Sequence, residues 1–127
     1  MTRVIVLGHG GYGTAVKMNL GMLLGELEGF SYIDFNPGDD LDILNERLAS
    51  VIQGIEHEPI LFACDLTGGS PFRQACLLAA EHPNMVVVAG INTSGYADIA
   101  YALDLSPLAL AEQAIASSKE AMQVFHL

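Results

Sequence analysis

The chain contains little positive charge. Five Lys and Arg residues stand against fifteen Asp and Glu residues, which gives a formal net charge of −10 at neutral pH. Because nucleic-acid binding depends on Lys and Arg side chains that neutralise phosphates, this balance argues against a nucleic-acid partner. A surface with this excess of negative charge is instead compatible with basic protein partners.

Cysteine is scarce too, with Cys64 and Cys76 as the only two residues of this type. They are too few and too far apart for a disulfide framework or for the C-x-x-C spacing of metal and redox sites. We therefore expect two core thiols, and we expect neither a metal site nor another cofactor. The acids Asp39, Asp40 and Asp42 lie at the start of a helical pattern, and we interpret them as capping residues, with Asp39 or Asp40 as the cap itself.

Long apolar runs are missing as well. No stretch approaches the roughly 20 apolar residues that a membrane-spanning helix needs. The apolar run Val4–Leu7 is too short for a signal peptide, because Gly8 and His9 interrupt it. We therefore expect a cytoplasmic protein.

The chain does contain enough apolar residues for one packed core. Of its 127 residues 51% are hydrophobic, and a single domain over residues 1–127 is expected at this length. Short apolar runs bounded by glycine or turn residues alternate with stretches of helical periodicity. The predicted strands are Arg3–His9, Phe30–Phe35, Ile60–Cys64 and Met85–Ala89. The predicted helices are Tyr12–Glu28, Leu41–Ile55, Phe72–Glu81, Tyr96–Leu103 and Leu108–Lys119.

This alternation of strands and helices predicts a doubly wound α/β sheet with right-handed crossovers. Ser70 and Ser106 are each followed by proline, which predicts that each serine caps a helix. The tail Ala121–Leu127 alternates roughly between apolar and polar residues, so it is predicted to form a fifth strand.

The first predicted strand runs into a glycine-rich loop that has three interpretations. Gly8, Gly10 and Gly13 fit the G-x-G-x-x-G pattern of dinucleotide-binding folds, with Asp34 about twenty residues further on, where a ribose-binding acid is expected. In the second interpretation, His9 has a chemical role, because the loop between a strand and a helix places backbone N–H groups opposite an anion. In the third, the glycines only permit a tight turn and His9 is a solvated loop residue.

A second loop, Asp65–Pro71, follows the third predicted strand. If the first and third strands are neighbours, His9 and Asp65 face each other at the carboxyl edge of the sheet, where such folds bind ligands. A carboxylate that accepts a hydrogen bond from one ring nitrogen fixes the tautomer of the imidazole and leaves the other nitrogen free to attack. His9 and Asp65 are therefore the candidate catalytic residues. Candidate donors to a phosphoryl group are the backbone N–H groups of Gly10, Gly11, Gly68 and Gly69 and the hydroxyl groups of Thr67 and Ser70.

The second loop also argues against two other kinds of site. It lacks the lysine of the G-x-x-x-x-G-K-[ST] loop that binds ATP. The G-x-S-x-G pattern of a serine nucleophile is absent, because Gly69-Ser70 is followed by Pro71.

Four short segments together carry a family resemblance: Gly8-His9-Gly10, Asp34-Phe35, Pro37-Gly38 and Asp65–Phe72. They resemble the enzyme IIA domain of the mannose, fructose and sorbose family of the bacterial phosphoenolpyruvate:sugar phosphotransferase system (PTS). The resemblance covers nearly the whole chain, and the Gly-Gly-Ser-Pro-Phe segment is its most specific part. Two positions depart from the family pattern: Arg73 stands where Asn is expected, and Asn92–Gly95 replaces a more apolar, proline-containing loop.

The resemblance implies a particular version of the fold. It is a doubly wound three-layer α/β sandwich with four parallel strands in the order 2-1-3-4. The tail, residues 121–127, would form an antiparallel strand that is exchanged in a homodimer and covers an exposed edge of the partner's sheet.

The resemblance also implies a role as a phosphotransferase in sugar uptake, without a metal. His9 would accept a phosphoryl group from the phosphohistidine of the carrier protein HPr, on the ring nitrogen remote from the backbone, and pass it to a separate enzyme IIB. Asp65 would hold the other ring nitrogen. The membrane enzymes IIC and IID would take part only indirectly, so the protein would lie in the cytoplasm or at the periphery of the membrane transporter.

Three alternatives remain at this point. The phosphocarrier subunit of dihydroxyacetone kinase places a histidine on a similar fold, but its second loop does not resemble Gly-Gly-Ser-Pro-Phe. A small Rossmann-like dinucleotide-binding module would use the three glycines of the first loop and Asp34. A purely regulatory or structural dimerisation domain would leave His9 without chemistry.

Overall fold

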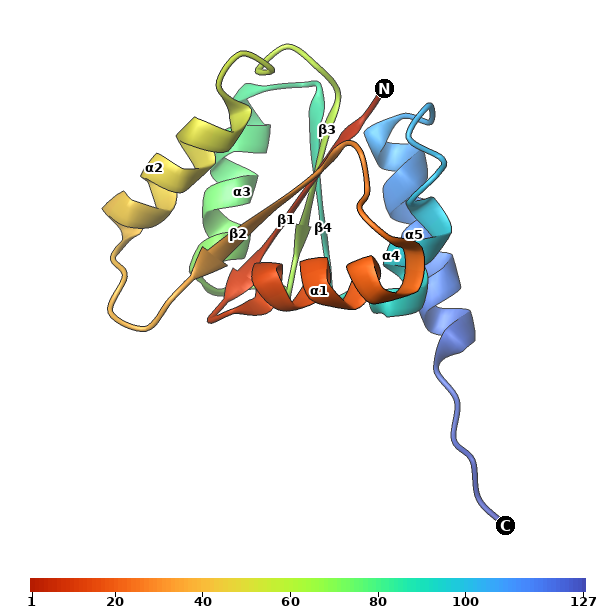
Figure 1. The fold of residues 1–127 in the computed structure, drawn as a ribbon. Coiled ribbons are helices and arrows are strands. Elements are labelled where there is room, and N and C mark those ends of the chain that lie inside the picture. The colour runs from red at the N-terminus through yellow and green to blue at the C-terminus, as the bar shows by residue number, and fades with distance from the viewer.

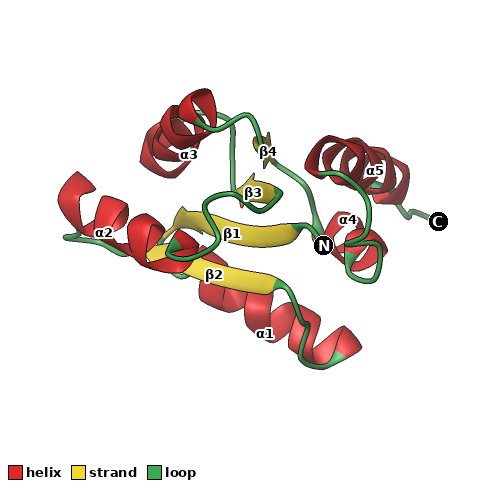
Figure 2. Ribbon diagram, turned by 90° about the horizontal axis from the view of Figure 1, so that it is seen from above, coloured by secondary structure: helices red, strands yellow, loops and turns green.

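The computed structural model describes residues 1–127 as a three-layer α/β sandwich (Figures 1 and 2). Its strands are β1 (Arg3–His9), β2 (Phe30–Phe35), β3 (Ile60–Cys64) and β4 (Met85–Ala89). They form one sheet in the order β2-β1-β3-β4, and all neighbouring strands are parallel. The predicted fold class, strand bounds and strand order are confirmed.

Five helices surround the sheet: α1 (Tyr12–Leu24), α2 (Leu41–Ile52), α3 (Gly69–Glu81), α4 (Thr93–Ile99) and α5 (Pro107–Ala121). Helices α1, α4 and α5 cover one face, and α2 and α3 cover the other (Figures 1 and 2). The two central strands, β1 and β3, are thus buried on both sides, which explains why Val4–Leu7 and Ile60–Cys64 are apolar without alternation.

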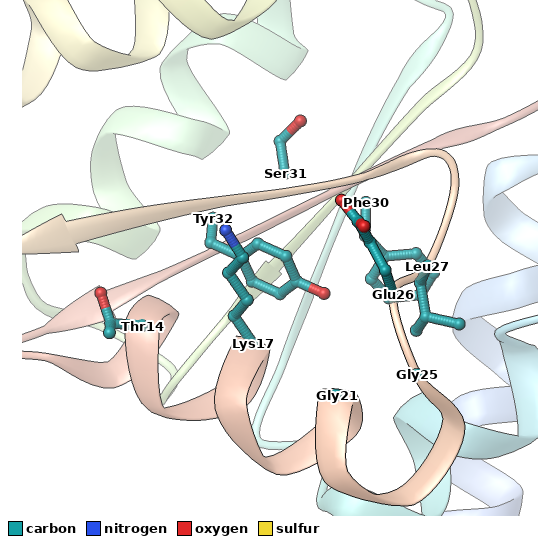
Figure 3. Close-up of a pocket in the computed structure, with 9 residues that line it drawn as sticks. All are labelled: Thr14, Lys17, Gly21, Gly25, Glu26, Leu27, Phe30, Ser31 and Tyr32. Carbon is teal, nitrogen blue, oxygen red and sulfur yellow. The ribbon is translucent and has the colours of Figure 1, made fainter.

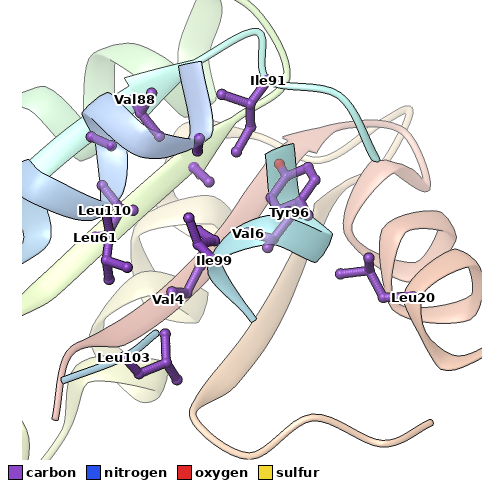
Figure 4. Packing of buried hydrophobic residues seen from close by; sticks show 13 residues of the cluster. Val4, Val6, Leu20, Leu61, Val88, Ile91, Tyr96, Ile99, Leu103 and Leu110 are labelled. Carbon is purple, nitrogen blue, oxygen red and sulfur yellow. The ribbon is translucent and has the colours of Figure 1, made fainter. Parts of the chain in front are cut away.

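The centre of the sheet is the most buried part of the molecule. All five residues of β3 are buried, and Val4–Leu7 in β1 are at most 1% exposed. Side chains on one face of the sheet pack with α1, α4 and α5 in the cluster shown in Figure 4, and those on the other face pack with α2 and α3. Full burial of one Val, Leu, Ile or Phe side chain stabilises a fold by about 1.5–3 kcal/mol. The two central strands therefore form a rigid base for the loops that follow them.

Three helices end earlier than predicted, and one of them is α4, which ends at Ile99 instead of Leu103. α1 ends at Leu24, because Gly25 adopts a φ of +80° that breaks the helical conformation. α2 ends at Ile52. The predicted caps of α2 and α5 are confirmed: the Asp40 side chain accepts a hydrogen bond from the N–H of Ile43, and Ser106 caps α5 in the same way.

Two helices begin earlier than predicted. Gly68 and Gly69 have φ values of +97° and +77°, and this turn starts α3 at Gly69 with Gly68 as its N-cap. The prediction that Ser70 caps the helix is therefore wrong, since Ser70 lies in the first turn. α4 begins at Thr93 because the Asn92 side chain caps it.

The tail also differs from its prediction. α5 continues through Ala121, and residues 122–127 then extend away from the body of the molecule without forming a strand (Figure 1). The helix carries the chain past the sheet, so the tail has no strand to pair with inside the single chain. Val124 and Phe125 are 89% and 87% exposed. Exchange of this segment between two copies stays a prediction.

Cys64 lies in the core, as expected, whereas Cys76 in α3 does not belong to the core clusters. Cys64 is buried and Cys76 is partly buried, and both are free thiols. Burial raises the pKa of the Cys64 thiol to about 12, so this group is protonated at neutral pH. No helix of the protein combines the length and the apolar character that a membrane crossing requires.

Candidate functional site

The structure brings His9 and Asp65 together at the carboxyl edge of the sheet. His9 ends β1 and Asp65 follows β3, and these two strands are neighbours. The Nδ1 atom of His9 lies 2.7 Å from Oδ2 of Asp65, and the backbone N–H of His9 donates to the same oxygen at 3.0 Å. One carboxylate oxygen therefore holds both the backbone and the ring of His9.

The Asp65 carboxyl is ionised in this arrangement. Burial raises its pKa, but the hydrogen bonds that it accepts from the N–H and ring of His9 lower the pKa by more, and the net shift is downward. Its other oxygen accepts the N–H of Leu66 at 3.0 Å. Because a carboxylate can only accept hydrogen bonds, Nδ1 of His9 must carry the hydrogen, which leaves a lone pair on Nε2.

The free nitrogen of His9 lies beside the start of α3. A Cβ added to Gly69 would lie 2.7 Å from Cε1 and 3.0 Å from Nε2 of His9, so only glycine fits against the imidazole here. No side chain caps α3, and the first N–H groups of a helix have no partner within it. The His9 side chain is 44% exposed. An anion attached to Nε2 would thus be accessible and would lie at an uncapped helix N-terminus, which favours negative charge.

The predicted phosphoryl-binding residues divide into two groups. Thr67, Gly68, Gly69 and Ser70 lie at the turn that starts α3, and of these Gly69 lies directly against the ring of His9.

Gly10 and Gly11 belong instead to the connection between β1 and α1. The N–H of Gly10 donates to the carbonyl of Phe35 at 2.7 Å, so it is not a free donor. Gly10 has a φ of +59°, which allows the sharp turn after His9. Gly11 is the N-cap of α1.

The dinucleotide pattern has a structural explanation. Both carboxylate oxygens of Asp34 accept hydrogen bonds from Thr14, one from its N–H at 2.9 Å and one from its hydroxyl. Asp34 therefore caps α1 from the neighbouring strand. A Cβ on Gly13 would lie 2.7 Å from the carbonyl oxygen of Ile33, so this glycine allows α1 to approach β2. Asp34, the residue that would bind a ribose in a dinucleotide fold, already has both carboxylate oxygens hydrogen-bonded to Thr14.

Three aromatic residues around His9 and Asp65 were not predicted as part of the site. The ring of Phe35 lies edge-on to the imidazole with centroids 6.2 Å apart, because the register of β1 and β2 pairs Phe35 with His9. The ring of Tyr12 packs against Gly8, and its hydroxyl is bonded to that of Tyr96. The contact with Phe35 follows from the shared end of two strands. No local pattern predicts the contact between Tyr12 and Tyr96, since it joins two helices that are far apart in the sequence.

The most voluminous pocket lies away from this pair. A cavity of about 650 Å³ opens between α1 and β2, and Figure 3 shows Lys17 reaching from the helix toward the strand beside Tyr32. Neither His9 nor Asp65 lines this cavity. No group of three or more His, Cys, Asp or Glu side chains is arranged to hold a metal ion. The chemistry of the His9 and Asp65 pair, rather than cavity size, marks the candidate site.

Sequence comparisons identify related proteins. A family model described as "PTS system fructose IIA component" matches residues 3–94. The PTS system fructose-specific EIIA component of Bacillus subtilis (strain 168) is 35% identical over 94 residues, which make up 72% of this chain and 64% of that protein. The PTS system mannose-specific EIIAB component of Escherichia coli (strain K12) is 33% identical over 109 residues, 84% of this chain and 34% of that protein. The chain thus spans less than two thirds of either relative.

Solved structures show the same fold over nearly the full length. The mannose/sorbose specific IIA subunit of the phosphotransferase system from Enterococcus faecalis gives a TM-score of 0.90 at 24% identity, over 99% of this chain and 96% of that chain. The phosphotransferase system component EIIA from Streptococcus agalactiae gives 0.87 at 24% identity, over 98% and 97%.

The fold and the paired loops define the class of PTS enzyme IIA components. The family model covers well over half of the chain, so the chain belongs to the enzyme IIA family whose relatives include fructose, mannose and sorbose components. The family resemblance predicted from the loops is confirmed.

Proposed function

We propose that this protein carries a phosphoryl group on Nε2 of His9 during sugar uptake. It receives the group from the phosphohistidine of HPr and passes it to a separate enzyme IIB. The observation that carries the proposal is the geometry of His9: its Nδ1 is held by Asp65 at 2.7 Å, while its Nε2 lies beside the uncapped start of α3.

The transfer is a substitution at phosphorus between two imidazoles. The lone pair on Nε2 of His9 attacks the phosphorus, and the bond between phosphorus and the HPr nitrogen breaks. The bonding pair stays on the HPr ring, whose other nitrogen already carries a hydrogen, so that the ring leaves as a neutral imidazole. His9 keeps its hydrogen on Nδ1 throughout, and the positive charge that develops on its ring faces the Asp65 carboxylate.

Backbone donors at the start of α3 hold the phosphoryl oxygens in this proposal. The proposed donors are the N–H groups of Gly68, Gly69 and Ser70 and the hydroxyls of Thr67 and Ser70, supported by their place at the start of α3, where Gly69 lies against the His9 ring. Gly11 is the N-cap of α1, and its N–H stays a candidate donor from the loop after His9. Gly10 shapes the turn after His9. Its N–H is not available to the phosphoryl group, because it donates to the carbonyl of Phe35 in β2.

The overall formal charge of −10 suits basic protein partners. On the surface beside the candidate site, Leu66, directly after Asp65, is 48% exposed and offers an apolar contact. We propose that HPr and enzyme IIB use this surface in turn. The membrane enzymes IIC and IID would then have no direct contact with this chain and would depend on enzyme IIB for the phosphoryl group. This chain would lie in the cytoplasm or at the periphery of the membrane transporter.

The test is phosphorylation in a reconstituted system. The chain is incubated with labelled phosphoenolpyruvate, enzyme I and HPr, and peptide mapping locates the label. We expect one acid-labile phosphate on His9, no label when HPr is omitted, and loss of the label when an enzyme IIB of this family is added. Absence of label, or label on another residue, would refute the proposal.

Substitution of Gly69 is expected to impair transfer strongly. In Gly69→Ala the new Cβ would lie 2.7 Å from His9 Cε1, so the ring must move. Displacement of a reacting group by about 1 Å costs up to about 100-fold, and we expect the rate of transfer from phospho-HPr to fall by about 10- to 100-fold. Rapid-quench kinetics with labelled HPr measures this rate.

Gly54→Ala is the matched control. Gly54 has a φ of +84°, but no atom lies within 4 Å of a Cβ built there. Both variants carry the penalty of a left-handed alanine, about 1–2 kcal/mol, but only Gly69→Ala crowds His9. Equal transfer rates in the two variants would show that the contact with His9 has no role.

We also propose that residues 122–127 pair with the sheet of a second copy. Two observations support this pairing: Val124 and Phe125 are exposed, and the sheet has open edges at β2 and β4. A chain that ends at Ala121 should then be a monomer by light scattering at a concentration where the full chain is a dimer. The same mass per particle for both chains would contradict strand exchange.

A further inference from the structure

A pair of tyrosine hydroxyls links α1 to α4 beneath the loop that carries His9. Tyr12 opens α1, and its hydroxyl lies 2.5 Å from that of Tyr96 in α4. The Tyr96 residue is only 2% exposed and lies within the cluster of core residues in Figure 4. Because a buried hydroxyl needs a partner, this contact fixes the Tyr12 phenol in one position.

The Tyr12 ring shares the space above Gly8 with Asp65. A Cβ built on Gly8 would lie 2.6 Å from Cδ2 of Tyr12 and 2.8 Å from both Cβ and Cγ of Asp65. The missing side chain at Gly8 therefore lets the tyrosine ring and the carboxylate lie against the same point of β1. Burial raises the pKa of the Tyr12 hydroxyl, and the nearby negative charge of Asp65 raises it further, which agrees with this proximity.

The carboxylate of Asp65 is largely shielded from water. Its side chain is only 13% exposed, although it lies in the loop after β3 at the carboxyl end of the sheet. Hydrogen bonds from His9 and Leu66 fix its oxygens, but they do not shield its carbon atoms. In a water-poor environment the hydrogen bond that the His9 ring donates to Asp65 is stronger and more strictly oriented than it would be in solvent.

We propose that Tyr12 is a positioning residue for phosphoryl transfer, held in place by the hydroxyl of Tyr96. Its ring forms the wall beside Asp65 and keeps the carboxylate where it accepts from Nδ1 of His9, and the carboxylate in turn leaves the lone pair on Nε2. Since Asn92 caps α4, the helix that carries Tyr96, this contact also makes the position of Asp65 depend on the loop between β4 and α4. The inference rests on the proposed function, because it assigns a role within the same transfer.

Two substitutions at Tyr12 separate the ring from the hydroxyl. Tyr12→Leu removes the aromatic wall, whereas Tyr12→Phe keeps it and removes only the contact with Tyr96. We expect kcat for transfer from phospho-HPr to fall by about ten-fold in Tyr12→Leu with KM unchanged, because the reacting nitrogen is less well positioned. In Tyr12→Phe and in Tyr96→Phe we expect a smaller fall of kcat, about three-fold or less. The double variant with both phenylalanines should have the same kcat as either single variant, since all three lose the same hydrogen bond.

Tyr32→Leu is the control for general loss of packing. Tyr12 and Tyr32 both pack against the same core cluster, but Tyr32 lies in β2 beside the cavity in Figure 3 and away from Gly8. The same chemical change at Tyr32 should lower stability and leave kcat unchanged. An equal fall of kcat in both Leu variants would overturn the inference.

The ¹⁵N chemical shifts of the His9 imidazole provide a readout that does not depend on phosphoryl transfer. In the unchanged protein we expect one tautomer with hydrogen on Nδ1, and in folded Tyr12→Leu a mixture of tautomers. Unchanged shifts together with unchanged kcat in Tyr12→Leu would refute the positioning role. If the unchanged protein accepts no phosphoryl group at all, the proposed function fails, and the shifts still decide whether Tyr12 orients His9.

Discussion

His9→Gln is expected to abolish phosphorylation of the protein by phospho-HPr completely. Glutamine can still hydrogen-bond to Asp65, but an amide nitrogen has no available lone pair and cannot take the place of Nε2. The His9 side chain is 44% exposed, so its replacement should change the free energy of unfolding by no more than about 0.5 kcal/mol. Labelling with phosphoenolpyruvate, enzyme I and HPr measures the first effect, and urea unfolding measures the second.

The other histidines serve as internal controls for this prediction. His57 and His126 are exposed, and Nδ1 of His82 is bonded to the carbonyl of Leu78 at 2.9 Å. None of the three is paired with a carboxylate in an ion pair. His57→Gln should therefore take up the full amount of label. Residual label in His9→Gln would place the phosphoryl group on one of these residues and would contradict the role of His9.

The strands and the meeting of His9 with Asp65 could be predicted because they depend on strong and local signals. A run such as Ile60–Cys64, without a polar residue, is specific to a strand that is covered on both faces. Parallel strands end at the same edge of a sheet, so residues directly after β1 and β3 must come close if these strands are neighbours. The sequence therefore indicated the candidate pair before any distance was known.

The start of α3 could not be predicted, because it depends on backbone conformation rather than on side-chain pattern. The dipeptide Ser70-Pro71 is a common helix start, but the positive φ values of Gly68 and Gly69 begin the helix sooner. This shift has a functional consequence. It places Gly69 against the His9 ring, whereas a start at Pro71 would leave the glycines in a preceding loop.

The roles of Asp34 and Tyr96 depend on tertiary contacts, which the sequence pattern does not contain. Asp34 has the right spacing for a ribose, but Thr14 occupies both of its oxygens once α1 packs against β2. In the sequence, Tyr96 is one apolar position of a predicted helix. Its hydroxyl reaches that of Tyr12 only because α4 packs across the sheet next to α1. The tail likewise has an alternating pattern, yet a strand also needs a neighbour, and the single chain offers none at residues 122–127.

Asp65→Asn is expected to slow phosphoryl transfer by about 10²- to 10⁴-fold while the fold stays intact. An asparagine amide can donate to Nδ1 as well as accept from it, so the imidazole can adopt the tautomer that has its hydrogen on Nε2 and cannot attack. The variant also loses the negative charge that faces the ring when the phosphoryl group arrives. Single-turnover kinetics with phospho-HPr measures the rate, and ¹⁵N shifts of His9 report the tautomer. A fall of less than about ten-fold, with the Nδ1-protonated tautomer retained, would show that Asp65 does not orient His9.

The pH dependence of stability gives a second test of the same carboxylate. Its pKa in the folded chain lies below the ordinary value of 3.8, because the hydrogen bonds from His9 outweigh the effect of burial. A group whose pKa is lowered on folding stabilises the protein above its unfolded pKa, and that contribution is lost as the pH falls through the folded pKa. The unchanged protein should therefore be more stable than Asp65→Asn near pH 7, and the difference should shrink below about pH 4, which urea titrations across this range can measure. A difference that stays constant with pH would mean that the charge of Asp65 does not contribute to stability, and that its hydrogen bonds to His9 hold the site through geometry alone.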